Sequence, residues 1–69
     1  MEKYGWTLVS KKTGEPVPEG TLVETFRGEY AAVNGGMPPR HDASTGRVYT
    51  DLGEHFPSVY GLEWVEDRA

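Results

Sequence analysis

Glycine and proline interrupt this chain so often that no long regular element can form. Nine glycines and five prolines are spread over 69 residues. No stretch of 3.6-residue periodicity is long enough for a helix of three turns. The intervals between the breaks are short and rich in β-branched and aromatic residues, which favour strands. The sequence therefore predicts one all-β domain over residues 1–69, because a chain of this length has room for one domain only.

No covalent cross-link can reinforce such a domain, because the chain has no cysteine. The same absence excludes a metal site built on thiolates. A domain of this size buries only a thin core, so packing or self-association must stabilise it. Two tryptophans, four tyrosines and two phenylalanines supply much of the area that can be buried.

The β-forming intervals predict five strands, which cover residues 4–9, 21–26, 30–33, 47–50 and 62–65. In the first interval, Tyr4, Trp6 and Leu8 alternate and therefore share one face of a strand. Before the last strand, residues 57–61 predict a single 3-10 turn closed by Gly61.

The second interval alternates imperfectly. Leu22 and Phe26 share a face with Glu24, while Val23 points to the other side. This pattern predicts either a bulge or a strand with both faces partly covered.

A long loop is predicted over residues 35–46, after Asn34-Gly35-Gly36 ends the third strand. Pro38-Pro39 favours an extended start to this loop. A loop of this length in so short a chain is often functional. At the end of the chain, residues 66–69 predict a frayed tail.

Short strands, tight glycine turns and a 3-10 turn before the last strand form a pattern that resembles SH3-like barrels. The segments that carry the resemblance are Val17-Pro18-Glu19-Gly20-Thr21-Leu22-Val23, Arg27-Gly28-Glu29-Tyr30 and residues 56–64. The resemblance covers about residues 15–65 and implies a closed small barrel of five or six strands. Such closure would remove exposed sheet edges.

Several phrases of the sequence resemble short proteins carried by phages and prophages, which have no assigned activity. The phrases are Lys12-Thr13-Gly14-Glu15-Pro16-Val17, Phe26-Arg27-Gly28-Glu29, Pro38-Pro39-Arg40-His41, Ser44-Thr45-Gly46-Arg47-Val48-Tyr49 and Phe56-Pro57-Ser58-Val59. The resemblance implies a genomic context, in which a host protein is a plausible partner.

Catalytic and metal-binding motifs are not expected. His41, Asp42 and Ser44 are neighbours in one loop, whereas a nucleophile triad brings its members together in space beside an oxyanion hole. The two histidines with Asp42 and Glu54 match no spacing of metal ligands. We therefore expect no catalytic residue, no metal and no cofactor, and a protein that is not an enzyme.

One basic cluster stands out in the predicted loop region. Arg40, His41 and Arg47 lie close to Tyr49 in the sequence, and with Tyr60 they form the predicted binding surface. The basic cluster is suited to dock a phosphate, an acidic peptide or nucleic acid. Two simpler interpretations stay open. The arginines can pair with Asp42, Asp51 or Glu54 as surface charges commonly do, and the aromatic rings can cap the ends of the barrel.

The formal net charge of −4 bears on the partner. Diffuse binding to phosphates depends on clustered lysine and arginine, so a protein partner is favoured over nucleic acid. A structural or assembly subunit, completed by a homo-oligomer, is a third alternative. No apolar run approaches 18 residues, and no signal peptide is recognised, so we expect no membrane span and a cytoplasmic location.

Overall fold

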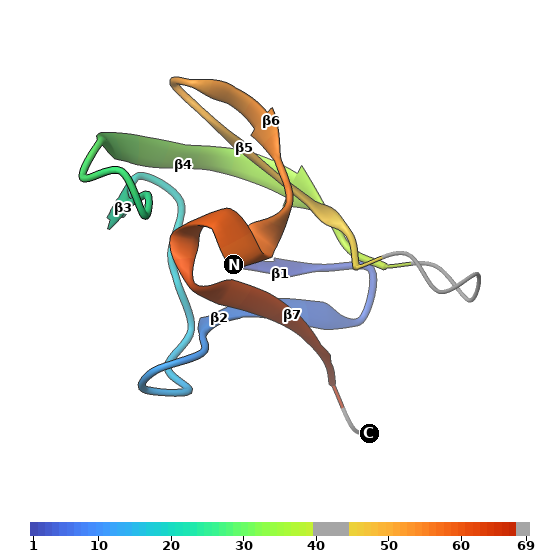
Figure 1. Cartoon of the computed structure of the whole chain (residues 1–69). Coiled ribbons are helices and arrows are strands. Elements are labelled where there is room, and N and C mark those ends of the chain that lie inside the picture. The colour runs from blue at the N-terminus through green and yellow to red at the C-terminus, as the bar shows by residue number, and fades with distance from the viewer. Residues whose placement is uncertain (40–44, 68–69) are drawn as a thin grey trace.

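The computed structural model describes residues 1–39 and 45–67. Strands dominate these residues, and the only helix among them is one 3-10 turn, η1 (Figure 1). In chain order the elements are β1 (Glu2–Lys3), β2 (Trp6–Ser10), β3 (Leu22–Glu24), β4 (Tyr30–Met37), β5 (Arg47–Thr50), β6 (Gly53–His55), η1 (Pro57–Tyr60) and β7 (Leu62–Glu66). The all-β prediction and the 3-10 turn before the last strand are therefore confirmed. Within the described ranges, no helix has the length and apolar character needed to cross a bilayer.

The strands form two antiparallel sheets rather than the closed barrel that the sequence predicted. One sheet has the order β1-β2-β7 and the other β3-β4-β5-β6 (Figure 1). The segment between β2 and β3 forms with β2 an isolated bridge between Val9 and Pro16 instead of a continuous ladder. Because Pro16 and Pro18 have no N–H to donate, this segment cannot continue a ladder, and the two sheets stay separate.

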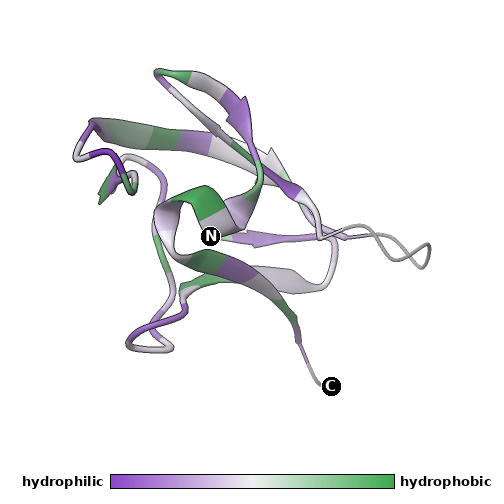
Figure 2. Ribbon diagram, in the orientation of Figure 1, coloured by the Kyte–Doolittle hydropathy of each residue, from purple (hydrophilic) through white to green (hydrophobic). Residues whose placement is uncertain are grey.

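The core lies between the two sheets, where apolar segments of both sheets and of η1 come together (Figure 2). Leu8, Val33 and Val48 are completely buried at its centre. Trp64 of β7 joins the sheets, since its indole Nε1 donates a hydrogen bond to the Arg47 carbonyl of β5 at 3.2 Å. Each buried side-chain nitrogen or oxygen among the described residues has a hydrogen-bond partner.

Two short strands were not predicted from the sequence. Tyr4, expected in the first strand, lies instead in the turn of the β1–β2 hairpin with a positive φ of 54°. β6 lies outside the five predicted strands, and it pairs with β5. Both strands are too short for an alternating pattern to be recognised.

Strand β3 buries the face opposite to its larger side chains. Val23 points into the core, whereas Leu22 and Phe26 are exposed. The strand ends at Glu24, and no bulge interrupts its pairing with β4. The predicted bulge or double coverage is therefore wrong, because one face of β3 packs on the core and the other meets solvent.

Strand β4 runs four residues beyond its predicted end at Val33 and finishes at Met37. A bulge between Val33 and Gly35 shifts the register with β5 and lets the strand continue through the glycines. The loop predicted over 35–46 therefore starts too early, since residues 35–37 pair with β5; its part over 40–44 lies outside the described residues.

The predicted tail also begins too early. Glu66 belongs to β7, and Asp67 is held to the β1–β2 hairpin. The Asp67 N–H donates to the Gly5 carbonyl at 2.8 Å, and the Thr7 hydroxyl donates to the Asp67 carboxylate at 2.6 Å. Residues 68–69 lie outside the described part of the chain.

Candidate functional site

One face of the four-stranded sheet points away from the core, and none of its side chains is buried by the described part of the chain. Its strands alternate between buried residues and residues on this outer side. We call it the outer sheet face and define it by seven side chains. They are Leu22, Glu24, Tyr30, Arg47, Tyr49, Glu54 and Phe56.

Large apolar side chains dominate the outer sheet face. Leu22 is 68% exposed, Tyr30 65% and Phe56 50%. Tyr49 is half-buried because its ring lies against Gly35 of β4, whose missing side chain leaves room for it. Several exposed apolar side chains on the same face of a sheet favour an interaction surface.

Strand register places a carboxylate beside each tyrosine. Glu24 of β3 is directly opposite Tyr30 of β4, and Glu54 of β6 is directly opposite Tyr49 of β5. Side chains in such positions have Cβ atoms about 5 Å apart. The outer sheet face therefore carries two pairs of one ring and one carboxylate.

The guanidinium group of Arg47 makes its contacts within the molecule. Its guanidinium lies over the Phe56 ring, 4.2 Å from the ring centroid, and its Nη1 donates a hydrogen bond to the Gly46 carbonyl at 2.9 Å. One simpler interpretation paired the arginines with Asp42, Asp51 or Glu54. Among the described residues, Arg47 pairs with neither Asp51 nor Glu54, and Asp51 accepts a hydrogen bond from the Ala32 N–H at 3.4 Å; Asp42 lies outside these residues.

The structure brings together only part of the predicted binding surface. Arg47 and Tyr49 share the outer sheet face. Arg40 and His41 lie outside the described residues. Tyr60 does not belong to this surface, because it is 6% exposed and packs in the core.

The hydroxyl of Tyr60 explains why this polar ring can be buried. It lies 3.0 Å from the Thr50 hydroxyl and 3.2 Å from Nδ1 of His55. Both contacts satisfy the hydroxyl inside the fold. The simpler interpretation, in which such rings complete the core, therefore describes Tyr60.

Sequence reasoning missed Leu22, Tyr30 and Phe56 as surface residues. It also missed the two glutamates that pair with the tyrosines. The one clue in the sequence was Val23, because it lies on the opposite side of the strand from Leu22 and Glu24. The other sheet decides which face of the strand meets the core, and the local sequence pattern does not reveal this.

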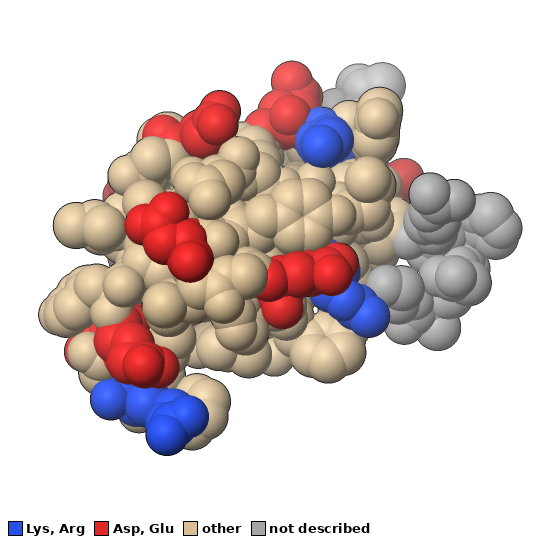
Figure 3. Space-filling view, turned by 90° about the horizontal axis from the view of Figure 1, so that it is seen from above, with Lys and Arg blue, Asp and Glu red and all other residues tan. Residues whose placement is uncertain are grey.

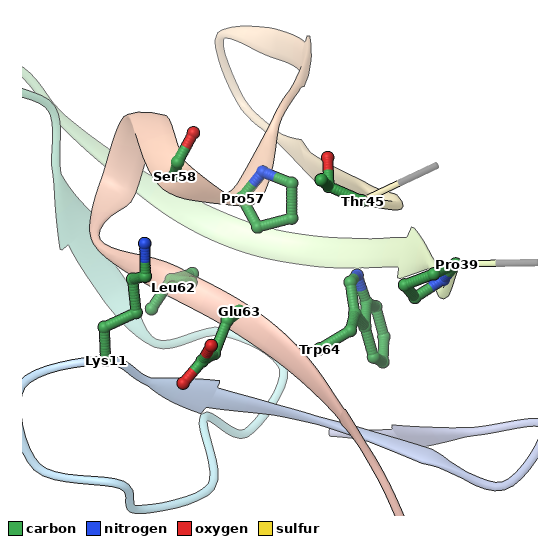
Figure 4. Close-up of a pocket in the computed structure, with 8 residues that line it drawn as sticks. All are labelled: Lys11, Pro39, Thr45, Pro57, Ser58, Leu62, Glu63 and Trp64. Atoms are coloured by element: carbon green, nitrogen blue, oxygen red, sulfur yellow. The ribbon is translucent and has the colours of Figure 1, made fainter. Parts of the chain in front are cut away.

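Two small clefts lie away from the outer sheet face. The cleft in Figure 4 lies between β7, η1 and the ends of β4 and β5, with Trp64 and Pro39 near one end and Lys11 and Glu63 near the other. Its volume of about 220 Å³ is below the range of typical ligand pockets. The second cleft, of about 370 Å³, lies between the β3–β4 turn, β6 and η1.

Side chains suited to metal binding or catalysis are few among the described residues. Over 1–39 and 45–67, no three His, Asp or Glu side chains gather closely enough to hold a metal ion. The pKa of Glu2 is raised, first because of a hydrogen bond to the Asp67 side chain and then because of the negative charge of that carboxylate. This pair lies on the three-stranded sheet, away from the outer sheet face.

Comparison with known proteins gives no relative. No family model, curated protein or solved structure matches this chain.

Proposed function

We propose that this chain is a non-enzymatic binding module that docks a partner protein on its outer sheet face. One observation carries the proposal. Leu22, Tyr30 and Phe56 remain largely exposed on one side of a sheet whose other side forms the core. Aromatic side chains that stay exposed beside polar groups are enriched where proteins bind one another.

The charge of this face favours a protein over nucleic acid. Arg47 is the only lysine or arginine on β3, β4, β5 and β6, and its guanidinium already stacks on Phe56. Glu24 and Glu54 would repel phosphate groups. Small barrels that bind single strands combine stacking rings with a basic groove, whereas Arg47 is the only lysine or arginine among the seven residues of this face.

We further propose that the two sheets form an open version of the SH3-like arrangement, which the 3-10 helix directly before the last strand supports. The resemblance to phage and prophage proteins makes a protein of the bacterial host the expected partner. The third alternative, a self-assembling subunit, would use the same exposed face and is distinguished by the mass in solution.

The proposal is tested by capture of a partner from a lysate of the native host. The variant Leu22→Ser/Tyr30→Ser removes the exposed side chains of β3 and β4 and is expected to lose the partner. The variant Tyr4→Ser is the matched control, because Tyr4 is 77% exposed but lies on the other sheet.

Both variants are expected to keep the melting temperature of the wild type, since they change exposed side chains. Retention of the partner by Leu22→Ser/Tyr30→Ser would contradict the proposal, as would its loss in Tyr4→Ser.

A further inference from the structure

We infer that the partner segment is basic: an extended stretch of chain with two arginine or lysine side chains about four residues apart. The inference rests on the proposed function, because it names the chemistry that the same face would recognise. It follows from the two tyrosine–glutamate pairs, from the charge around these pairs and from the distance that separates one pair from the other.

Each tyrosine–glutamate pair offers a place for one cation. Glu24 is opposite Tyr30, and Glu54 is opposite Tyr49. A guanidinium or ammonium group placed on the ring would gain the attraction of the aromatic face and a charge-assisted hydrogen bond to the carboxylate. The ring alone would accept many apolar groups, so the carboxylate gives the preference for a cation.

Within residues 1–39 and 45–67, lysine and arginine side chains lie over two other exposed rings, but not over Tyr30 or Tyr49. Arg47 lies over Phe56 at 4.2 Å, and Lys3 lies over Tyr4 at 5.8 Å. Among the residues of the described ranges, no lysine or arginine lies over Tyr30 or Tyr49. Tyr30 is 65% exposed and Tyr49 is half-buried, and each is opposite a carboxylate, so a cation from another molecule has access to both pairs.

The surrounding charge points the same way. Asp51, which accepts a hydrogen bond from the Ala32 N–H, adds a third carboxylate at the end of β5. Figure 3, seen from the side of the β5–β6 hairpin, shows a surface made mostly of uncharged residues, with acidic side chains at several separate places and basic ones at fewer. A second copy of the same face would bring carboxylates against carboxylates, so a basic partner is the complementary occupant.

The strand register sets the spacing of the two cations. Tyr49 of β5 is opposite Gly35 of β4. Tyr30 lies earlier on β4, and the residues between it and Gly35 include one bulge residue. With a rise of 3.3 Å per residue and 4.8 Å between strands, the two tyrosines are about 14 Å apart. An extended peptide covers this distance in about four residues, and side chains at that spacing point to the same side.

A synthetic peptide provides the test. The fluorescently labelled probe Gly-Ser-Arg-Thr-Val-Thr-Arg-Ser-Gly is titrated with the full chain at low ionic strength, and binding is followed by anisotropy. The variant Glu24→Gln/Glu54→Gln is expected to weaken binding about tenfold or more, because it removes both carboxylates that face the cations. The same peptide with glutamine in place of both arginines is expected not to bind.

The control variant Glu15→Gln/Glu19→Gln removes the same number of charges from exposed positions between β2 and β3. It is expected to bind the probe within about twofold of the wild type, since distant surface charges act only through the screened field. Equal weakening in both double variants would overturn the inference, because net charge alone would then explain binding.

Absence of probe binding by the wild type would also overturn it. If a captured partner still depended on Leu22 and Tyr30 in that case, the proposed function would stand and only the basic chemistry would fail. If the partner ignored those residues and the probe did not bind, both would fail. Binding of an acidic peptide or an oligonucleotide on this face would overturn the inference directly.

Discussion

Gly36 lies where the indole of Trp64 comes closest to β4. A Cβ atom at this position would be 2.7 Å from the Arg47 carbonyl oxygen and 2.9 Å from Cζ2 of Trp64. The carbonyl oxygen is held by strand pairing and also accepts the hydrogen bond from the indole. The absence of a side chain at Gly36 therefore permits the contact that joins the two sheets.

The substitution Gly36→Ala is expected to lower the free energy of unfolding by about 1–3 kcal/mol, because the added methyl group overpacks a rigid site. Urea denaturation measures this difference. Gly35→Ala is the matched control, since its Cβ would meet only Cδ2 of Tyr49 at an ordinary 3.7 Å. Equal stability of the two variants would show that Trp64 does not pack against β4 as described.

The carboxylates of Glu2 and Asp67 repel one another at neutral pH. The hydrogen bond between them and the charge of Asp67 raise the pKa of Glu2 in the folded chain. A carboxyl group with a raised pKa binds its proton more tightly in the folded state than in the unfolded state. This site therefore stabilises the fold as the pH falls through the raised pKa, and loses that contribution as the pH rises.

The substitution Glu2→Gln is accordingly expected to raise the melting temperature at neutral pH. At a pH below the ordinary range of glutamate, wild type and variant are expected to melt at similar temperatures, because Glu2 is then neutral in both states. Thermal unfolding followed by circular dichroism at the two pH values measures the effect. A Glu2→Gln variant less stable than wild type at neutral pH would contradict the described contact.

Among the elements, the turn between β3 and β4 depends on one buried hydroxyl. Thr25 is buried, and its Oγ1 accepts hydrogen bonds from the N–H groups of Arg27 and Glu29, both at 3.2 Å. Its own N–H donates to the Glu29 carbonyl at 2.8 Å. These bonds fix the hairpin that sets Glu24 opposite Tyr30.

The substitution Thr25→Val keeps the shape of the side chain but removes the acceptor for two N–H groups. A loss of about 1–3 kcal/mol in the free energy of unfolding is expected. Thr25→Ser keeps the hydroxyl and is expected to retain more of the stability. Chemical denaturation compares the three proteins, and a Thr25→Val variant as stable as the wild type would show that the hydroxyl does not support the turn.

The strands that the sequence predicted best are those with a clear boundary and a clear alternation. β5 and η1 were placed correctly because glycine and proline delimit them. β4 was cut short because glycines were interpreted as a turn, whereas close packing of Trp64 requires glycine inside the strand. Local pattern cannot reveal a contact made by a residue distant in the sequence.

The same limit applies to the candidate site. The sequence singled out Arg47 and Tyr49, which do share one face, because basic and aromatic residues are adjacent there. It could not pair the tyrosines with their glutamates, since the register between strands is set by the turns and by the bulge in β4. Tyr60 was misplaced because an aromatic residue in a small domain can serve the core or the surface equally well by composition.

For the whole molecule, the distribution of charge bears on self-association. The net charge is −4, and three carboxylates lie on or beside the outer sheet face, so two copies would repel one another there. The chain is therefore expected to sediment with the mass of a single chain at neutral pH and low salt. A dimer under these conditions that dissociates in the Leu22→Ser/Tyr30→Ser variant would favour the assembly subunit instead.

Docking on the outer sheet face is visible residue by residue in solution. The isotope-labelled chain is titrated with its captured partner, and the changes in amide chemical shift are mapped onto the strands. The largest changes are expected on β3, β4, β5 and β6, around Tyr30 and Tyr49, with little change on β1, β2 and β7. Changes concentrated on the three-stranded sheet, with the tyrosine–glutamate pairs unaffected, would contradict it.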